Sequence, residues 1–130
     1  MLVGSPAILI TDDDRDFRET LRDAFEPRGF QTHLAADGEE ALQVVGREQV
    51  HLLLLDMHMP RLDGIETVRR LRERQVAAPC ILMSARMDEA LAEQARQEDF
   101  FSSLPKPIQF GQVIDAVHRA LRVAYGWGNQ

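Results

Sequence analysis

Aspartates stand at the ends of two apolar segments of the sequence, and they are the residues best placed for chemistry. One apolar run is followed at once by Asp12, Asp13 and Asp14, and the most apolar run of the chain, over residues 51–55, stops at Asp56. Carboxylates held in one crevice repel one another, so they raise a pKa or attract a cation, and their oxygens suit a hard divalent ion such as Mg²⁺. Asp14 leads directly into a helical pattern and is better explained as a helix N-cap. The other three aspartates predict a Mg²⁺ site.

A hydroxyl and the only lysine of the chain follow two later apolar segments. Ser84 comes after the run PCILM, and Lys106 lies in the segment LPKP, in a chain whose other basic residues are arginines. Taken singly, such a serine is usually a turn residue and such a lysine a surface cation. At neighbouring strand ends, however, the two donors and a metal ion would together neutralise a phosphoryl group. We therefore interpret Ser84 and Lys106 as parts of the same site as the aspartates.

Short apolar segments alternate with longer amphipathic ones along the chain. A parallel strand covered on both faces is apolar throughout, whereas a surface helix repeats its apolar residues every three or four positions. The expected strands cover residues 7–11, 30–34, 51–55, 79–83 and 100–104, and the expected helices include residues 14–27 and 110–121. This alternation predicts an α/β fold, a doubly wound five-stranded parallel sheet of order 2-1-3-4-5 with five helices. Ligands of such a sheet bind at the carboxyl ends of the strands, where Asp12 and Asp56 would converge.

Composition limits the class of protein. The chain has 130 residues, a single cysteine, Cys80, and a net charge of −6. This length supports one domain, and the acidic balance argues against a nucleic-acid-binding face. A lone cysteine forms no intrachain disulfide and fits a reducing compartment. The sequence shows neither a signal peptide nor an apolar run long enough to span a membrane, so we expect a cytoplasmic protein.

Five short motifs, in this order, resemble the response-regulator receiver domain of two-component signalling, which has the CheY-like fold. The motifs are ILITDDD, AADGEEAL, LLLLDMHMPRLDGIE, LMSA and LPKP, and the match runs from about Ile8 to about Leu121. Each motif is weak alone, whereas the set in this order is specific. The resemblance implies a receiver domain over residues 1–124 and a short tail, residues 125–130, with no effector domain.

The resemblance also implies a role for each residue of the site. Asp56 matches the aspartate that accepts a phosphoryl group from a phosphohistidine on a partner kinase. The Mg²⁺ ligands of the family match Asp12, Asp13, the Asp56 carboxylate and the backbone carbonyl of His58. Ser84 and Lys106 match the residues that bind phosphoryl oxygens, and the bond between Lys106 and Pro107 is often cis in the family.

By this resemblance the chain is a signalling switch and not a turnover enzyme, because it catalyses only its own phosphorylation and dephosphorylation. The partners implied are a sensor histidine kinase or a phosphotransfer protein, and a downstream effector protein. The effector would bind the face made by the fourth helix, the fifth strand and the fifth helix. We expect no direct contact with nucleic acid or with a membrane.

One position departs from the family pattern. Receiver domains usually carry an aromatic residue three positions before the lysine, and its ring rotates inward on activation; this chain has Ser103 there. We expect the coupling from the site to the effector face to be altered or absent. The departure leaves open an alternative function, a receiver that binds partners without being phosphorylated, although the complete acidic, serine and lysine set argues against it.

Two other classes of protein share parts of the pattern. A haloacid-dehalogenase-type phosphatase also uses a strand-end aspartate and Mg²⁺, but it needs a second aspartate two residues later, where this chain has His58. A flavodoxin-like cofactor binder would hold a phosphate with the loop after the first strand. Three consecutive aspartates in that loop would repel the phosphate, so both classes are disfavoured.

Overall fold

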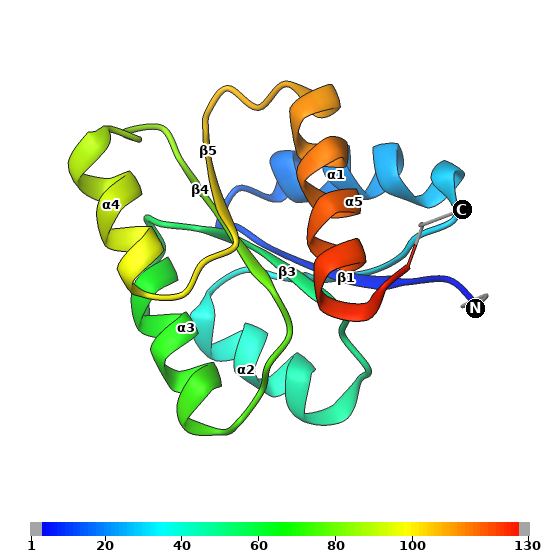
Figure 1. Ribbon diagram of the computed structural model, residues 1–130, viewed down its shortest axis with the longest axis horizontal. Helices are drawn as coiled ribbons and strands as arrows, with labels where there is room; N and C mark the ends of the chain where they lie inside the picture. Colours follow the sequence, from blue (N-terminus) through cyan, green and yellow to red (C-terminus); the bar gives the residue numbers. More distant parts are fainter. Residues whose placement is uncertain (1–3, 128–130) are drawn as a thin grey trace.

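The computed structural model describes residues 4–127 and shows a central parallel sheet with helices on both faces (Figure 1). The strand order is β2-β1-β3-β4-β5, so the predicted doubly wound fold is confirmed. The strands are β1 (Ala7–Thr11), β2 (Gln31–Ala35), β3 (Leu52–Asp56), β4 (Cys80–Ser84) and β5 (Ser102–Pro105). The helices are α1 (Arg15–Phe25), α2 (Gly38–Arg47), α3 (Gly64–Glu73), α4 (Glu89–Gln97) and α5 (Phe110–Tyr125).

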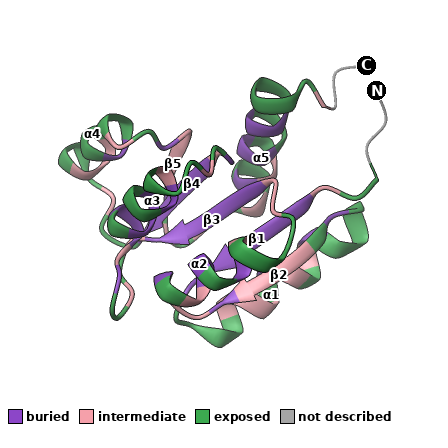
Figure 2. Cartoon of the chain, turned by 90° about the horizontal axis from the view of Figure 1, so that it is seen from below, coloured by how far each residue is buried: buried purple, intermediate pink, exposed green. Residues whose placement is uncertain are grey.

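Burial on both faces explains why the inner strands are apolar throughout. All residues of β1, β3 and β4 are buried, whereas β2 and β5, at the edges of the sheet, are partly exposed (Figure 2). Successive side chains of a strand point to opposite faces. Leu53 and Leu55 accordingly pack in the apolar cluster with α2, α3 and α4, while Leu52 and Leu54 pack in the cluster with α1 and α5. The run of four leucines therefore contributes to both apolar clusters, one on each face of the sheet.

Aspartates begin the first four helices. Asp14, Asp37, Asp63 and Asp88 are the N-caps of α1 to α4, and each side chain accepts a hydrogen bond from a backbone N–H of its helix. An N-cap carboxylate satisfies an open N–H group and is favoured by the positive end of the helix. The N-cap role predicted for Asp14 is confirmed.

The ends of several elements differ from the sequence prediction. Helix α1 stops at Phe25, and the next residues, Glu26–Arg28, form a 3₁₀ turn. Strand β5 begins at Ser102 instead of residue 100, because Phe100 precedes the paired residues and packs into the core beside α4. Helix α5 continues to Tyr125, so this residue belongs to the helix and not to the predicted tail.

The structure describes all but a few residues at each end of the chain. Residues 1–3 of the predicted domain and residues 128–130 of the predicted tail lie outside the described residues. Among residues 4–127, no helix is both long enough and apolar enough to cross a lipid bilayer.

Candidate functional site

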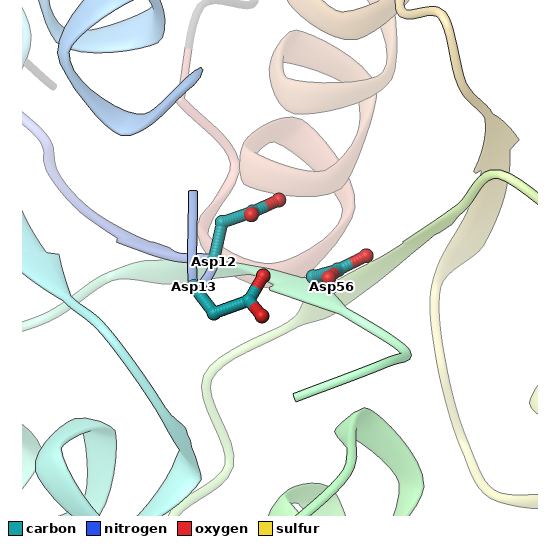
Figure 3. A group of neighbouring side chains, drawn as sticks. All are labelled: Asp12, Asp13 and Asp56. Atoms are coloured by element: carbon teal, nitrogen blue, oxygen red, sulfur yellow. The ribbon is translucent and has the colours of Figure 1, made fainter. Parts of the chain in front are cut away.

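Three aspartates meet at the carboxyl ends of β1 and β3, which are neighbours in the sheet. Thr11 pairs with Leu55 in the parallel register, so the residues that follow them lie side by side. One carboxylate oxygen from each of Asp12, Asp13 and Asp56 lies within 4.8 Å of the others (Figure 3). Asp12 and Asp56 are buried, whereas Asp13 is exposed. A ligand would therefore reach the cluster from the side of Asp13.

Asp12 is held in place from several directions. Its backbone N–H donates to the carbonyl of Ala35 at 3.1 Å, and its own carbonyl accepts from Arg18 Nη1 at 2.7 Å. Its Oδ1 accepts from the backbone N–H of Asp14 at 2.9 Å, and its Oδ2 accepts from Lys106 Nζ at 2.5 Å. These bonds fix the carboxylate before a ligand arrives, which lowers the entropy lost on binding.

Lys106 reaches the acidic cluster from the end of β5. Its backbone N–H donates to the carbonyl of Ser84 at 2.9 Å, and its bond to Pro107 is cis, as the family resemblance implies. Besides its contact with Asp12, the ammonium lies 3.3 Å from Asp56 Oδ1. The only lysine of the sequence is thus ion-paired with two of the three clustered carboxylates.

The clustered charges perturb each other. Burial raises the pKa of Asp56 to about 6, and the charge of Asp12 adds to this rise, while Lys106 opposes it. Burial by itself would lower the pKa of Lys106, but the hydrogen bond to Asp12 and the charges of Asp12 and Asp56 outweigh burial and raise it. At neutral pH the site therefore holds an ionised Asp56 whose charge is incompletely balanced, and a further cation would stabilise it.

Ser84 lies beside the site through the register of the sheet, and His58 lies in the loop that follows β3. Ser84 is buried at the end of β4, directly after Met83, the residue that pairs with Asp56 in the sheet. The Ser84 hydroxyl oxygen accepts the backbone N–H of Arg86 at 3.0 Å. His58 is exposed in the loop between β3 and α3. The register brings Ser84 to the edge of the site, whereas the role of the His58 carbonyl stays a prediction.

The arrangement of side chains fits a divalent cation. The cluster offers carboxylate oxygens alone, which are the hard ligands that Mg²⁺ prefers, and Asp13 leaves it open to solvent. Three carboxylates face one ammonium, so negative charge is in excess even when Lys106 is paired. Asp12, Asp13 and Asp56 are the residues that would hold the ion.

Two residues near the site were not singled out from the sequence. The ring of Phe17 lies under the Lys106 ammonium, with 4.3 Å between Nζ and the ring centroid. Arg18 donates to the carbonyl of Asp12. The apolar spacing of the first helix predicts Phe17 as a core residue, and it does pack against the core cluster beside α1 and α5. Helical spacing reports which face is buried, and it does not report a contact with the end of a distant strand.

Comparisons with known proteins agree on one family. Residues 8–118 match the model of the response regulator receiver domain. The response regulator MprA of Mycobacterium leprae is 39% identical over 118 residues, which are 88% of this chain and 50% of that protein. MprA of Mycobacterium ulcerans is 37% identical over 121 residues, 91% of this chain and 51% of that protein. The chain spans about half the length of the curated relatives it matches.

Solved structures show the same fold. The receiver domain of a Francisella response regulator superimposes with a TM-score of 0.87 at 28% identity, covering 92% of this chain and 99% of that one. The response regulator TrrA of Thermotoga maritima, solved in complex with Mg²⁺ and BeF, superimposes with a TM-score of 0.79 at 26% identity, covering 89% of this chain and 99% of that one.

Proposed function

The chain belongs to the response regulator receiver domain family of two-component signalling, and from this membership we propose that it accepts a phosphoryl group on Asp56. The donor is a phosphohistidine of a sensor kinase or of a phosphotransfer protein. Receiver domains are signalling switches, so the product of the reaction is a changed surface and not a released metabolite.

Each side chain of the site has its own role in the proposed phosphoryl transfer. An ionised Asp56 oxygen attacks phosphorus in line, the bond from phosphorus to the histidine nitrogen breaks, and the imidazole leaves with the electron pair. Lys106 offsets charge on the transferring oxygens, and the Ser84 hydroxyl donates to one of them. Water later attacks the acyl phosphate and returns Asp56 to its carboxylate form.

Asp12, Asp13 and Asp56, with the backbone carbonyl of His58, would hold Mg²⁺. When bound, this ion supplies positive charge beside the phosphoryl oxygens. The fixed Asp12 carboxylate and the exposed Asp13 carboxylate are suited to this task because one is held in place and the other faces solvent.

One observation supports this proposal most strongly: three carboxylates and the only lysine of the chain converge at adjacent strand ends. The similarity to TrrA, which was solved with Mg²⁺ and BeF, adds to it. Such a cluster is costly to fold, because like charges repel and burial raises the pKa of Asp56 to about 6. A functional requirement explains why the cost is tolerated.

The test is phosphorylation of the purified chain by acetyl phosphate in the presence and absence of Mg²⁺, followed by intact mass. We expect a mass gain of one phosphoryl group that requires Mg²⁺ and is lost in Asp56→Asn. Asp23→Asn, a change at an exposed aspartate of α1, is the matched control and should leave the reaction intact. No adduct on the unmodified chain, or an adduct that survives Asp56→Asn, would contradict the proposal.

A second function is favoured by Ser103, which stands where the family usually has an aromatic residue. In this alternative the domain binds its partner without being phosphorylated. The mass experiment separates the two functions. In either case the proposed effector surface is the face made by α4, β5 and α5, where a cavity of about 220 Å³ lies between α4 and β5.

A further inference from the structure

Within residues 4–127, three side chains interact with the ammonium of Lys106, and the proposed function explains only two of them. The two carboxylates, Asp12 and Asp56, lie 2.5 and 3.3 Å from Nζ. The third neighbour is the ring of Phe17 on α1, with its centroid 4.3 Å from Nζ. We propose that Phe17 is a positioning residue, whose ring holds the Lys106 ammonium over the acidic cluster.

The environment makes this contact energetically significant. The Lys106 side chain is only 19% exposed, so its ammonium has lost much of its water. The negative face of an aromatic ring attracts a cation, and the attraction is stronger when the pair is desolvated than at an exposed site. The ring thus supplies an attractive contact for the ammonium in addition to the two carboxylates.

The ring itself is fixed by the same segment that carries the acidic residues. The backbone N–H of Phe17 bonds the side chain of Asp14, the N-cap of α1, at 3.3 Å. The next residue, Arg18, donates to the carbonyl of Asp12 at 2.7 Å. The first turn of α1 is therefore tied to the end of β1, and the backbone of Phe17 is held beside the segment that carries Asp12.

This arrangement has a consequence for the reaction, and that part of the inference rests on the proposed function. A metal ion and a phosphoryl group compete with Lys106 for the oxygens of Asp12 and Asp56. The ring of Phe17 is an uncharged partner for which neither ligand competes. Phe17 therefore keeps the ammonium near the transferring oxygens while its ion pairs are exchanged.

The contact can be detected in the free protein because Lys106 is the only lysine. Protein labelled with ¹³C at lysine Cε gives a single side-chain signal. With the ammonium over the ring face, we expect the Hε protons to be shifted upfield by the ring current. The shift should vanish in Phe17→Leu and Phe17→Met and persist in Phe17→Tyr. An Hε shift that is the same in the unmodified chain and in both aliphatic variants would overturn the inference.

The functional effect is measured as the rate of phosphorylation by acetyl phosphate. We expect Phe17→Leu to slow it about three- to tenfold, the change that about 0.7–1.4 kcal/mol produces, and Phe17→Tyr to restore it. Phe110→Leu is the matched control, because Phe110 is also half-buried in the same core cluster and its ring lies 4.7 Å from the Arg28 guanidinium, away from the site.

The two measurements distinguish a failure of this inference from a failure of the proposed function. If Phe110→Leu slows phosphorylation as much as Phe17→Leu, the ring of Phe17 acts through general packing and the inference is wrong. If the unmodified chain is not phosphorylated at all, the proposed function fails, while the Hε shift still decides whether the ring holds the ammonium. If Phe17→Leu fails to fold, Phe17→Met carries both measurements.

Discussion

At the scale of single residues, Asp56 lowers the stability of the folded chain whenever it is ionised. Its pKa rises from 3.8 to about 6 on folding, chiefly through burial. Between these values the folded state binds a proton more readily than the unfolded state does. The ionisation penalty is therefore absent below about pH 4, grows as the pH rises, and is complete above about pH 6, where it amounts to about 3 kcal/mol.

Asp56→Asn removes this penalty. We expect the free energy of unfolding in urea, without Mg²⁺, to rise by about 1–3 kcal/mol at about pH 7.5 and to change little at about pH 4. The lost contact with Lys106 reduces the gain, since that ammonium opposes the rise in the pKa of Asp56. Mg²⁺ should stabilise the unmodified chain more than the variant. An equal gain at both pH values would show that the charge of Asp56 is not its cause.

Lys106→Arg tests whether the shape of the cation matters. The ammonium fits between two carboxylates and an aromatic ring, whereas a guanidinium is wider and planar. We expect the fold to be retained and phosphorylation by acetyl phosphate to slow by about tenfold. Arg119→Lys, at an exposed position of α5, is the control and should have no effect. An unchanged rate in Lys106→Arg would make the lone lysine a coincidence of composition.

At the scale of elements, the start of α3 is packed directly against the end of β3. A Cβ added at Gly64 would lie 2.8 Å from the Asp56 carbonyl oxygen and 2.7 Å from Leu82 Cδ1. Gly64→Ala therefore has to move the backbone that carries Asp56. We expect a loss of about 1–3 kcal/mol of stability, and a slower phosphorylation rate, measured by urea unfolding and by intact mass.

The control for this substitution is Gly46→Ala in α2, where an added Cβ meets nothing within 4 Å. Alanine is a better helix former than glycine, so this variant should gain up to about 1 kcal/mol and react normally. If both variants have the same stability and rate, the close approach at Gly64 has no consequence.

The last turn of α5 is hydrogen-bonded to the amino-terminal end of the sheet, which is the end opposite the site. The Tyr125 hydroxyl donates to the carbonyl of His51 at 2.8 Å, and the His51 ring accepts the backbone N–H of Ala7 on Nδ1 at 2.9 Å. The ring of Trp127 stacks on that of Tyr125 and lies edge-on to His51. Neutral His51 thus links β1, β3 and α5, and protonation of Nδ1 would break its bond to Ala7.

His51 should make stability depend on pH. Burial lowers its pKa in the folded state below the ordinary 6.5, so the unfolded state binds a proton first as the pH falls. The stability that neutral His51 contributes is complete above pH 6.5 and is lost at lower pH. His51→Asn offers an acceptor that does not titrate in this range. We expect thermal unfolding of the variant to change less than that of the unmodified chain between about pH 7 and pH 5. Parallel changes would contradict this role.

At the scale of the whole molecule, the sheet order could be predicted because each buried strand is a short apolar run that can be recognised in the sequence. The run of four leucines and the aspartate after it place Asp56 at the site from the sequence alone. Contacts that form only where the chain folds back on itself leave no such pattern in the sequence. The run of charged residues over 69–74 predicts a solvated helix face. The Arg72 guanidinium nevertheless donates to the carbonyls of Val76 and Ala78, because the chain turns back at Gln75, whose φ is positive. The ring of Phe17 under Lys106 also escaped prediction, because helical spacing does not report a contact with the end of a distant strand.

The proposed effector surface includes β5, the strand that ends next to the site residue Lys106. Ser103 pairs with Leu82 of β4, is half-buried, and lines the cavity of about 220 Å³ together with residues of α4, among them Ala92 and Arg96. Phe101, which precedes β5 and packs against the core cluster beside α1 and α5, also lines it. The cavity therefore has room at the position where the family usually places an aromatic ring, and Ser103 does not fill it.

A small side chain at this position should limit how far the effect of phosphorylation spreads. We expect beryllofluoride with Mg²⁺ to change amide hydrogen exchange at the ends of β3 and β4 in the unmodified chain, with little change in α5. Ser103→Tyr supplies a ring that can occupy the cavity beside α4, so in this variant the change should extend across β5 into α5. Ser103→Thr, which adds one methyl group and no ring, is the control and should behave like the unmodified chain. If α5 responds equally in the unmodified chain and in Ser103→Tyr, the signal reaches the effector surface by a route that needs no aromatic residue.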